Sequence, residues 1–358
     1  MLLAAARYGY PNAKVRALRS RKLTEQDRHF LLAAKDLTSC LSYLATTSYN
    51  PCLPDPEKDI LNLSALERQL AQPLLDHYAK VVHSLRGAKE RNLILALFRR
   101  FEAENLKIVL RALFAGLSRD AVSHLLYPVG HLSDLDWDTL WACKSIRELL
   151  EHLRPDIFGR SLQHALPQFE AQGRLFPLEM ALDFSCFRLL RQAISLLCNR
   201  YDRTVTEKIL ALYIDILNIL WVIRLKIDYG LSPEEIVNYT LPEGNVITLG
   251  CLNRLSRVED IAAFINQLPA VFRHEVSDIR DWGKIGPSLE TYFLKILARI
   301  FSGQPFHIGV AVAYLLEKEI EFGGLITVLQ AKGKNLTVEE IDNRLPWQFS
   351  EIGHVQAG

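Results

Sequence analysis

Apolar residues recur at helical spacing along most of this chain. Between residues 94 and 112 a run of apolar positions, with one asparagine among them, advances by three or four residues at a time, so all of them share one face of a helix. They are Ile94, Phe98, Phe101, Asn105, Ile108 and Ala112. We expect this helix to end at Gly116, and another to begin at Ser232, where an N-cap serine precedes Pro233 and two carboxylates. Strand-like alternation is confined to residues 246–248, so the pattern predicts an all-α fold.

Three sequence patterns recur in the same order at intervals of about 110 residues. Leu-Glu opens a predicted helix at residues 66, 178 and 289, and a leucine precedes an aromatic residue in a turn at 44–49, 153–158 and 268–272. A third pattern, Leu followed by Ser or Thr at a helix start, occupies 117–122, 231–236 and 336–341. Helix-breaking Pro-x-Gly segments at 128–130 and 242–244 divide the copies. We predict three repeated helical modules, residues 1–127, 128–241 and 242–358, each a bundle with its own core.

Several polar residues fall on the apolar faces of these helices. Asn105 and Asn218 occupy equivalent positions, and we favour a structural hydrogen bond to a neighbouring helix terminus over a ligand contact. Asp215 and Glu102 also correspond, and a repeated polar position favours exposure to solvent or to a partner over catalysis. Residues 133–138 are rich in aspartate but lack the glycine and closing glutamate of a calcium loop, so they predict a helix N-terminus.

Charge and composition exclude some classes of partner. Lys and Arg number 42 against 41 Asp and Glu, so the net charge of +1 gives no global field for binding nucleic acid or an anionic bilayer. The longest apolar stretch, residues 209–223, is shorter than the roughly 20 residues of a membrane-spanning helix. Six cysteines without a CxxC pair indicate that most are buried thiols in a reducing compartment, with neither a zinc site nor a disulfide framework.

No pattern in the sequence proposes a reaction. Nucleotide-binding, hydrolase and zinc-protease motifs are missing, so we predict no catalytic residue, no cofactor and no metal site. Glu148 and His152 are interpreted as one side-chain pair on a helix. The strongest charge cluster is the basic run Lys14, Arg16, Arg19, Arg21 and Lys22. It is typical of a solvated helix face, with phosphates, lipid headgroups or an acidic protein surface as alternative contacts.

Several segments of this chain resemble the rotary-ATPase component that is called C in archaeal and bacterial A/V-type enzymes and d in eukaryotic V-ATPases. The segments are Tyr-Pro-Asn-Ala-Lys-Val-Arg-Ala-Leu-Arg-Ser at 10–20 with Thr-Ser-Tyr at 47–49, Phe-Glu-Ala-Glu-Asn-Leu-Lys at 101–107 with Leu-Arg-Ala at 110–112, and Ala-Tyr-Leu-Leu-Glu-Lys-Glu-Ile-Glu at 313–321. The chain departs from the family pattern at 322–325, where Phe-Gly-Gly-Leu replaces an asparagine-leucine-arginine segment.

The resemblance implies a funnel of pseudo-threefold symmetry that forms a socket between the D and F proteins of the central stalk and the membrane proteolipid ring. Such a component is non-catalytic, has no membrane span of its own, and is cytoplasmic and peripheral to the membrane. Within the matching motifs we expect Glu102, Glu104, Lys107 and Arg111 to face partners, together with Arg16 and Arg19. The coupled ion, proton or sodium, and the direction of the machine stay open. The alternative is a soluble helical scaffold unrelated to ion transport.

Overall fold

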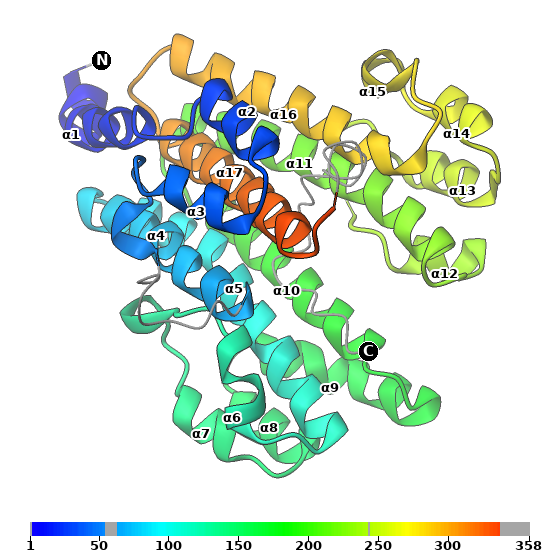
Figure 1. Ribbon diagram of the computed structural model, residues 1–358. Helices are drawn as coiled ribbons and strands as arrows, with labels where there is room; N and C mark the ends of the chain where they lie inside the picture. Colours follow the sequence, from blue (N-terminus) through cyan, green and yellow to red (C-terminus); the bar gives the residue numbers. More distant parts are fainter. Residues whose placement is uncertain (1, 54–62, 243, 337–358) are drawn as a thin grey trace. The chain divides into compact units, whose positions relative to one another are not determined.

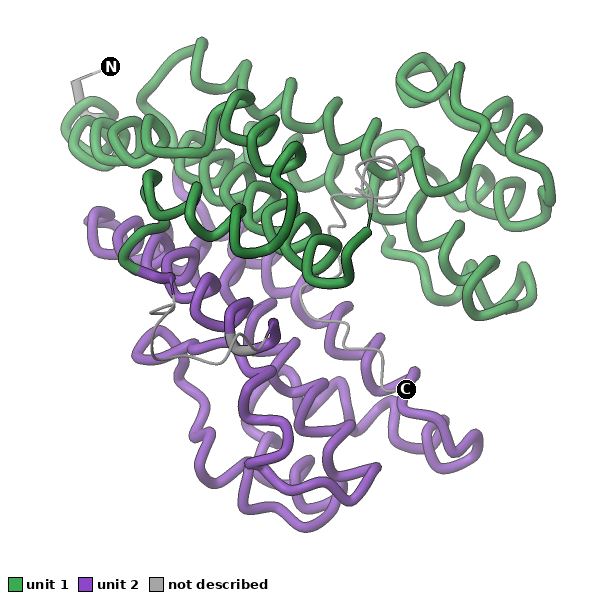
Figure 2. The backbone as a smooth tube through the Cα atoms, viewed as in Figure 1, with its two compact units in different colours: residues 1–51, 199–354 green, residues 52–198, 355–358 purple. Residues whose placement is uncertain are grey.

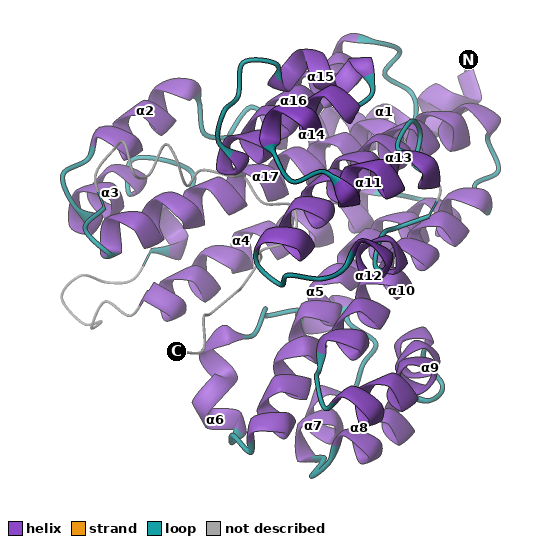
Figure 3. Cartoon of the chain, turned by 90° about the vertical axis from the view of Figure 1, so that its right-hand side faces the viewer, coloured by secondary structure: helices purple, strands orange, loops and turns teal. Residues whose placement is uncertain are grey.

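The computed structural model describes residues 2–53, 63–242 and 244–336. Over these residues the chain forms seventeen α-helices and four short 3-10 turns and no strand, which confirms the all-α prediction (Figures 1 and 3). Residues 246–248 are not a strand. The N–H groups of Val246 and Ile247 instead donate to the carboxylate of Asp215, at 2.9 and 3.0 Å. None of the helices described is long and apolar enough to cross a bilayer.

The helices group into two compact units, drawn in green and purple in Figure 2. Of the described residues, those numbered 2–51 and 199–336 form unit 1, and those numbered 52–198 form unit 2. These boundaries follow contacts within the chain and differ from those of the three predicted modules, which remain a prediction. Residues 337–341, the end of the third copy of one repeated pattern, lie outside the described residues.

Unit 2 is built around two long helices that pack along each other, α5 and α10. Its helices are α4 (Leu63–Ser84), α5 (Ala88–Ala115), α6 (Arg119–Val122), α7 (Trp137–Ala142), α8 (Ile146–Leu153), α9 (Ile157–Gln172) and α10 (Phe176–Ser195), with 3-10 turns η2 (Ser123–Leu125) and η3 (Gly130–Leu132). α9 packs on α10, and α8 contacts α9 and α5. Leu106 and Leu110 of α5 share a core with Leu178 and Leu182 of α10. Each fully buried leucine contributes about 1.5–3 kcal/mol of transfer free energy.

Unit 1 centres on α17, whose side chains are buried on almost every face. Its helices are α1 (Leu2–Arg19), α2 (Glu25–Ala33), α3 (Leu37–Leu44), α11 (Arg200–Ile227), α12 (Pro233–Asn238), α13 (Leu249–Arg257), α14 (Ile261–Gln267), α15 (Ala270–Val276), α16 (Ile285–Ser302) and α17 (Gly309–Gly333), with η4 (Trp282–Lys284) before α16 and η1 (Asn50–Cys52) where the two units divide. α17 contacts α1, α3, α11 and α16. The buried carboxylate of Asp202 accepts from the Tyr8 hydroxyl at 2.6 Å and from the Ile308 N–H at 3.0 Å, so one acid joins three segments.

Helix ends follow the capping signals of the sequence. α5 ends at Ala115, and Gly116 follows with φ of 67°, a left-handed conformation that glycine adopts without steric cost. α12 begins after Ser232, whose side chain and that of Glu235 form a reciprocal capping box, with Pro233 at the first helical position. Asp136 caps α7, which confirms that residues 133–138 contain a helix start.

The two asparagines form structural hydrogen bonds, as predicted, but to loop backbone instead of a helix terminus, and both do so in the same way. Asn105 donates to the carbonyl of Tyr127 at 2.9 Å and accepts from its N–H at 2.8 Å. Asn218 makes the same pair of bonds to Leu241, at 2.9 and 2.7 Å. Each amide therefore satisfies both backbone polar groups of one loop residue. That residue lies 22 or 23 positions after the asparagine, so the bonds hold the loop against the long helix.

Candidate functional site

Two charged residues of the 101–107 segment, Glu104 and Lys107, lie on the side of α5 that faces α10. Lys107 is buried at the centre of a charged trio, because its Nζ lies 2.8 Å from Oε1 of Glu104 and 2.7 Å from Oδ1 of Asp183 on α10. We call Glu104, Lys107 and Asp183 the Lys107 cluster. The Lys107 side chain is 7% exposed, so its charge is balanced almost entirely by the two carboxylates.

Burial and charge oppose each other in the Lys107 cluster. Burial by itself would lower the pKa of Lys107, but the carboxylates of Asp183 and Glu104 outweigh burial and raise that pKa. For Glu104, burial raises the pKa although the Lys107 ammonium opposes it. Lys107 is thus held as a cation, and its role is to join α5 to α10.

Two further arginines of α5, Arg99 and Arg111, tie this helix to other parts of unit 2. Arg111 Nε lies 2.7 Å from Oε1 of Glu179 on α10. Arg99 bridges two acids, with its NH1 2.6 Å from Glu102 Oε2 and its NH2 2.6 Å from Asp156 Oδ2, just before α9. Burial raises the pKa of Glu102, against the Arg99 charge that lowers it.

Arg16 and Arg19 belong to unit 1, where they bind two other helices. Arg19 forms a two-pronged pair with Glu317 of α17, at 2.8 and 2.9 Å, and Lys22 adds a third bond at 2.9 Å. Arg16 donates to the carbonyl of Phe301 at 2.7 Å. Glu317 is almost fully buried, so part of the basic run neutralises an internal acid.

All six residues predicted to face partners therefore have bonds within their own unit. Glu102 and Lys107 are buried and Glu104 is 16% exposed, whereas Arg111 and Arg19 keep about a third of their side-chain surface and Arg16 is exposed. That they bind partners remains a prediction. The related expectation that Glu102 and Asp215 face solvent or a partner is wrong with respect to solvent, since both are buried and each is satisfied inside the chain.

The last motif, 313–321, also points inward. Glu321 accepts from the Tyr49 hydroxyl at 2.9 Å and the Leu23 N–H at 3.1 Å, and Lys318 bonds both Glu321 and the Tyr49 oxygen. Sequence spacing gives no sign of such pairings, because Glu317 lies 298 residues from Arg19. Glu179 does carry a signal in the sequence, through its place in the repeated Leu-Glu pattern.

The charged segments of this chain thus join helices inside the two units, and they coincide with the segments that resemble a known family. The profile of the ATP synthase (C/AC39) subunit family matches residues 11–344. The chain belongs to this family. Among its members, the chain is 23% identical to the C subunit of the A-type ATP synthase of Methanocaldococcus jannaschii over 353 residues, which cover 96% of this chain and 88% of that protein.

Two other members of the family give similar values. The corresponding C subunit of the A-type ATP synthase of Methanothermobacter thermautotrophicus is 27% identical, over 91% of this chain and 84% of its own length. That of Pyrococcus horikoshii is 25% identical, over 93% and 90%. The ATP synthase (C/AC39) match therefore extends over nearly the whole chain and includes all the ion pairs described above.

Proposed function

We propose that this chain is a non-catalytic central-rotor component of an A/V-type rotary ATPase. In this role it is a socket that joins the D and F shaft to the membrane proteolipid ring, so that ATP hydrolysis or synthesis is linked to transport of protons or sodium ions. It associates with the membrane through the complex. The observation that carries the proposal is the match to the ATP synthase (C/AC39) subunit family over residues 11–344.

The bonds between helices are what a torque-bearing part requires. A coupler loses work if its helices slide, and bonds between charged groups on separate helices resist sliding because their geometry is specific. In unit 2 the Lys107 cluster and Arg111 connect α5 to α10. In unit 1 Glu317 and Asp202 connect α1 to the two long helices α17 and α11. These bonds support a stiff element more than a flexible adaptor.

Co-purification tests the proposal directly. The tagged chain would be isolated from detergent-solubilised membranes of its own host, and the accompanying chains identified by mass spectrometry. Recovery of the central-stalk and proteolipid proteins in fixed ratio is expected. If the chain came out alone or with unrelated proteins, while an assembled ATPase stayed in the membrane, the coupler function would be refuted and a scaffold function favoured.

A charge swap separates partner binding from folding. Arg111→Glu alone breaks the pair with Glu179, but Arg111→Glu with Glu179→Arg restores the pair with its charges exchanged. If Arg111 faces a partner, the double variant should fold normally and still lose affinity for the D and F proteins. If the double variant and the natural chain bound the D and F proteins with equal affinity, Arg111 would not be an interface residue.

A further inference from the structure

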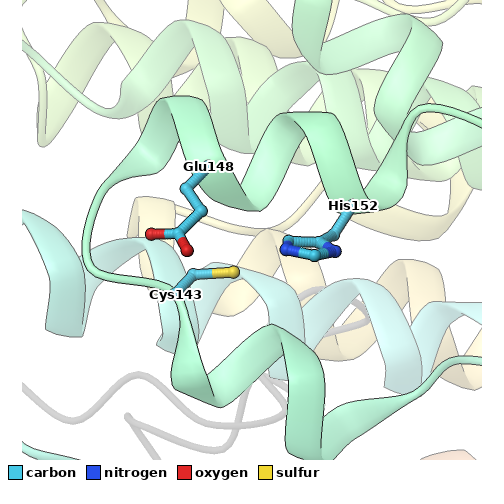
Figure 4. A group of neighbouring side chains, drawn as sticks. All are labelled: Cys143, Glu148 and His152. Atoms are coloured by element: carbon cyan, nitrogen blue, oxygen red, sulfur yellow. The ribbon is translucent and has the colours of Figure 1, made fainter.

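Three side chains with different metal-binding groups converge at the joint between α7 and α8. The sulfur of Cys143, a carboxylate oxygen of Glu148 and a ring nitrogen of His152 all lie within 4.8 Å of one another. Figure 4 shows Glu148 and His152 projecting from α8 toward the loop that carries Cys143, with the sulfur aimed at the imidazole. Cys143 is buried, while the other two are exposed, so the group opens toward solvent.

Hydrogen bonds at the start of α8 position two of these groups. Ser145 caps α8 by accepting from the Glu148 N–H, which fixes where the helix begins relative to Cys143. Glu148 and His152 are four residues apart and share one face of α8. One Glu148 oxygen accepts from the Lys144 N–H at 2.7 Å, which orients the carboxylate and leaves its second oxygen available.

The helix that the predicted repeat aligns with α8 is built in the same way but has none of these groups. α14 begins after Asp260, whose side chain accepts from the Ala263 N–H just as Ser145 accepts from Glu148. The residues in place of the cysteine, glutamate and histidine are Val258, Ala263 and Gln267. A short capped helix therefore forms without a cysteine, a glutamate and a histidine at these positions, so the N-cap alone does not require the three groups.

We propose that Cys143, Glu148 and His152 form a zinc site that clamps the α7–α8 joint. A thiolate, an imidazole and a carboxylate are ligands that Zn²⁺ takes in tetrahedral sites, and one position stays open for water. Tetrahedral ligands around zinc lie roughly 3.5 Å apart, given bond lengths of about 2.0–2.3 Å. Side-chain rotations of the two exposed residues close that distance. On binding, the Cys143 thiol releases its proton to solvent and its hydrogen bond to the Thr139 carbonyl is replaced by the S–Zn bond.

Sequence spacing misses this site because zinc motifs are recognised in a sequence by paired cysteines or paired histidines. Here each ligand type occurs once, at Cys-x4-Glu-x3-His, a spacing that is meaningful only after the loop has turned α8 back over Cys143. Hard cations such as Mg²⁺ and Ca²⁺ prefer all-oxygen ligands, so the sulfur and nitrogen favour Zn²⁺.

Metal titration of the full-length purified chain tests the site. Zn²⁺ would be titrated by calorimetry, and Co²⁺ by absorption, because a thiolate ligand gives Co²⁺ a near-ultraviolet charge-transfer band. We expect one ion per chain, that band, and a rise in melting temperature that a chelator reverses. Cys143→Ser and His152→Gln should each weaken binding about tenfold or more and reduce the Co²⁺ signal. His152 is exposed, so its substitution leaves folding intact.

Matched controls are Cys198→Ser and His164→Gln, which change an exposed cysteine and an exposed histidine elsewhere in unit 2. Both should bind Zn²⁺ as the natural chain does. Absence of stoichiometric binding would overturn the proposal, as would binding that Cys143→Ser and His152→Gln leave unchanged.

Discussion

Removal of the Asn218 side chain should destabilise the protein more than removal of Asn105, although the two make the same hydrogen bonds. Both amides bond the N–H and the carbonyl of one residue farther along the chain. The difference lies in that residue: Leu241 is buried, whereas Tyr127 is half-buried. After Asn218→Ala the two Leu241 groups have no water to replace the amide.

The magnitude follows from the cost of unsatisfied polar groups. A buried donor or acceptor without a partner costs about 1–3 kcal/mol. Two such groups at Leu241 give about 2–6 kcal/mol, with about 4 kcal/mol as the central value for Asn218→Ala. At Tyr127 partial access to water reduces the cost, and Asn105→Ala should lose about 1–2 kcal/mol. The larger value is a substantial fraction of the roughly 5–15 kcal/mol that typically separates folded from unfolded proteins.

Urea denaturation of the full chain, followed by circular dichroism, measures both costs. Asn253→Ala serves as the control, because within the described part of the chain its amide bonds the Leu249 carbonyl alone, one turn earlier in α13. We expect the order Asn218 above Asn105 above Asn253, with the last within about 0.5 kcal/mol of the natural chain. If Asn105→Ala lowered the free energy of unfolding as much as Asn218→Ala, solvent access to the bonded backbone groups would not explain the size of the loss.

Three further substitutions probe other buried charges. Lys107→Met should cost about 3 kcal/mol in the free energy of unfolding, since it leaves two acids facing each other between α5 and α10. Asp215→Asn should cost about 2 kcal/mol, because both carboxylate oxygens accept backbone N–H groups and an amide offers only one acceptor. Burial raises the pKa of Glu290 well above its usual value although Arg28 opposes it, so the folded state favours the protonated acid. The stability from Glu290 is therefore fully present below the ordinary glutamate pKa of about 4.3, and it is lost as pH rises from there through the raised pKa. Glu290→Gln should raise the melting temperature at neutral pH, and this gain should shrink toward pH 4.

Exposed residues provide the controls for these three. Arg147→Gln breaks a surface ion pair and Asp138→Asn alters an acid whose side chain is 86% exposed, so each should change stability by less than about 1 kcal/mol. Glu207→Gln replaces an exposed glutamate and should leave the pH profile of the melting temperature unchanged. A Glu290→Gln gain that stayed constant from pH 4 to pH 8 would contradict the assignment of a protonated acid.

Local features of the fold can be predicted from the sequence, and long-range partners cannot. The apolar stripe on α5, the left-handed Gly116 and the capping box at Ser232 depend on residues a few positions apart, whose relation is fixed by helix geometry. For Asn105, the need for a partner is predictable because a buried amide is costly without one. That its partner is Tyr127 depends on the path of the chain between them.

The expectation for Asp215 fails for an instructive reason. A polar position that recurs in two copies suggests exposure, but in both copies it is buried, and the internal partners differ. Asp215 accepts from backbone N–H groups, while Glu102 pairs with Arg99. At these two positions, which the sequence pattern aligns, recurrence of a polar residue is therefore no guide to its exposure.

Internal bonds also limit which of the six predicted residues can bind a partner. A partner can recruit a charged side chain only if the new contact exceeds what the side chain already has. Lys107 and Glu102 would have to leave buried pairs at a cost of about 3 kcal/mol or more, which few interface contacts repay. Arg16 is exposed and Arg19 and Arg111 are about one-third exposed, so each can take a second acid while it keeps its internal bond. An interface made from the six predicted residues therefore rests on its arginines, and the exchanged pair at positions 111 and 179 is its most direct test.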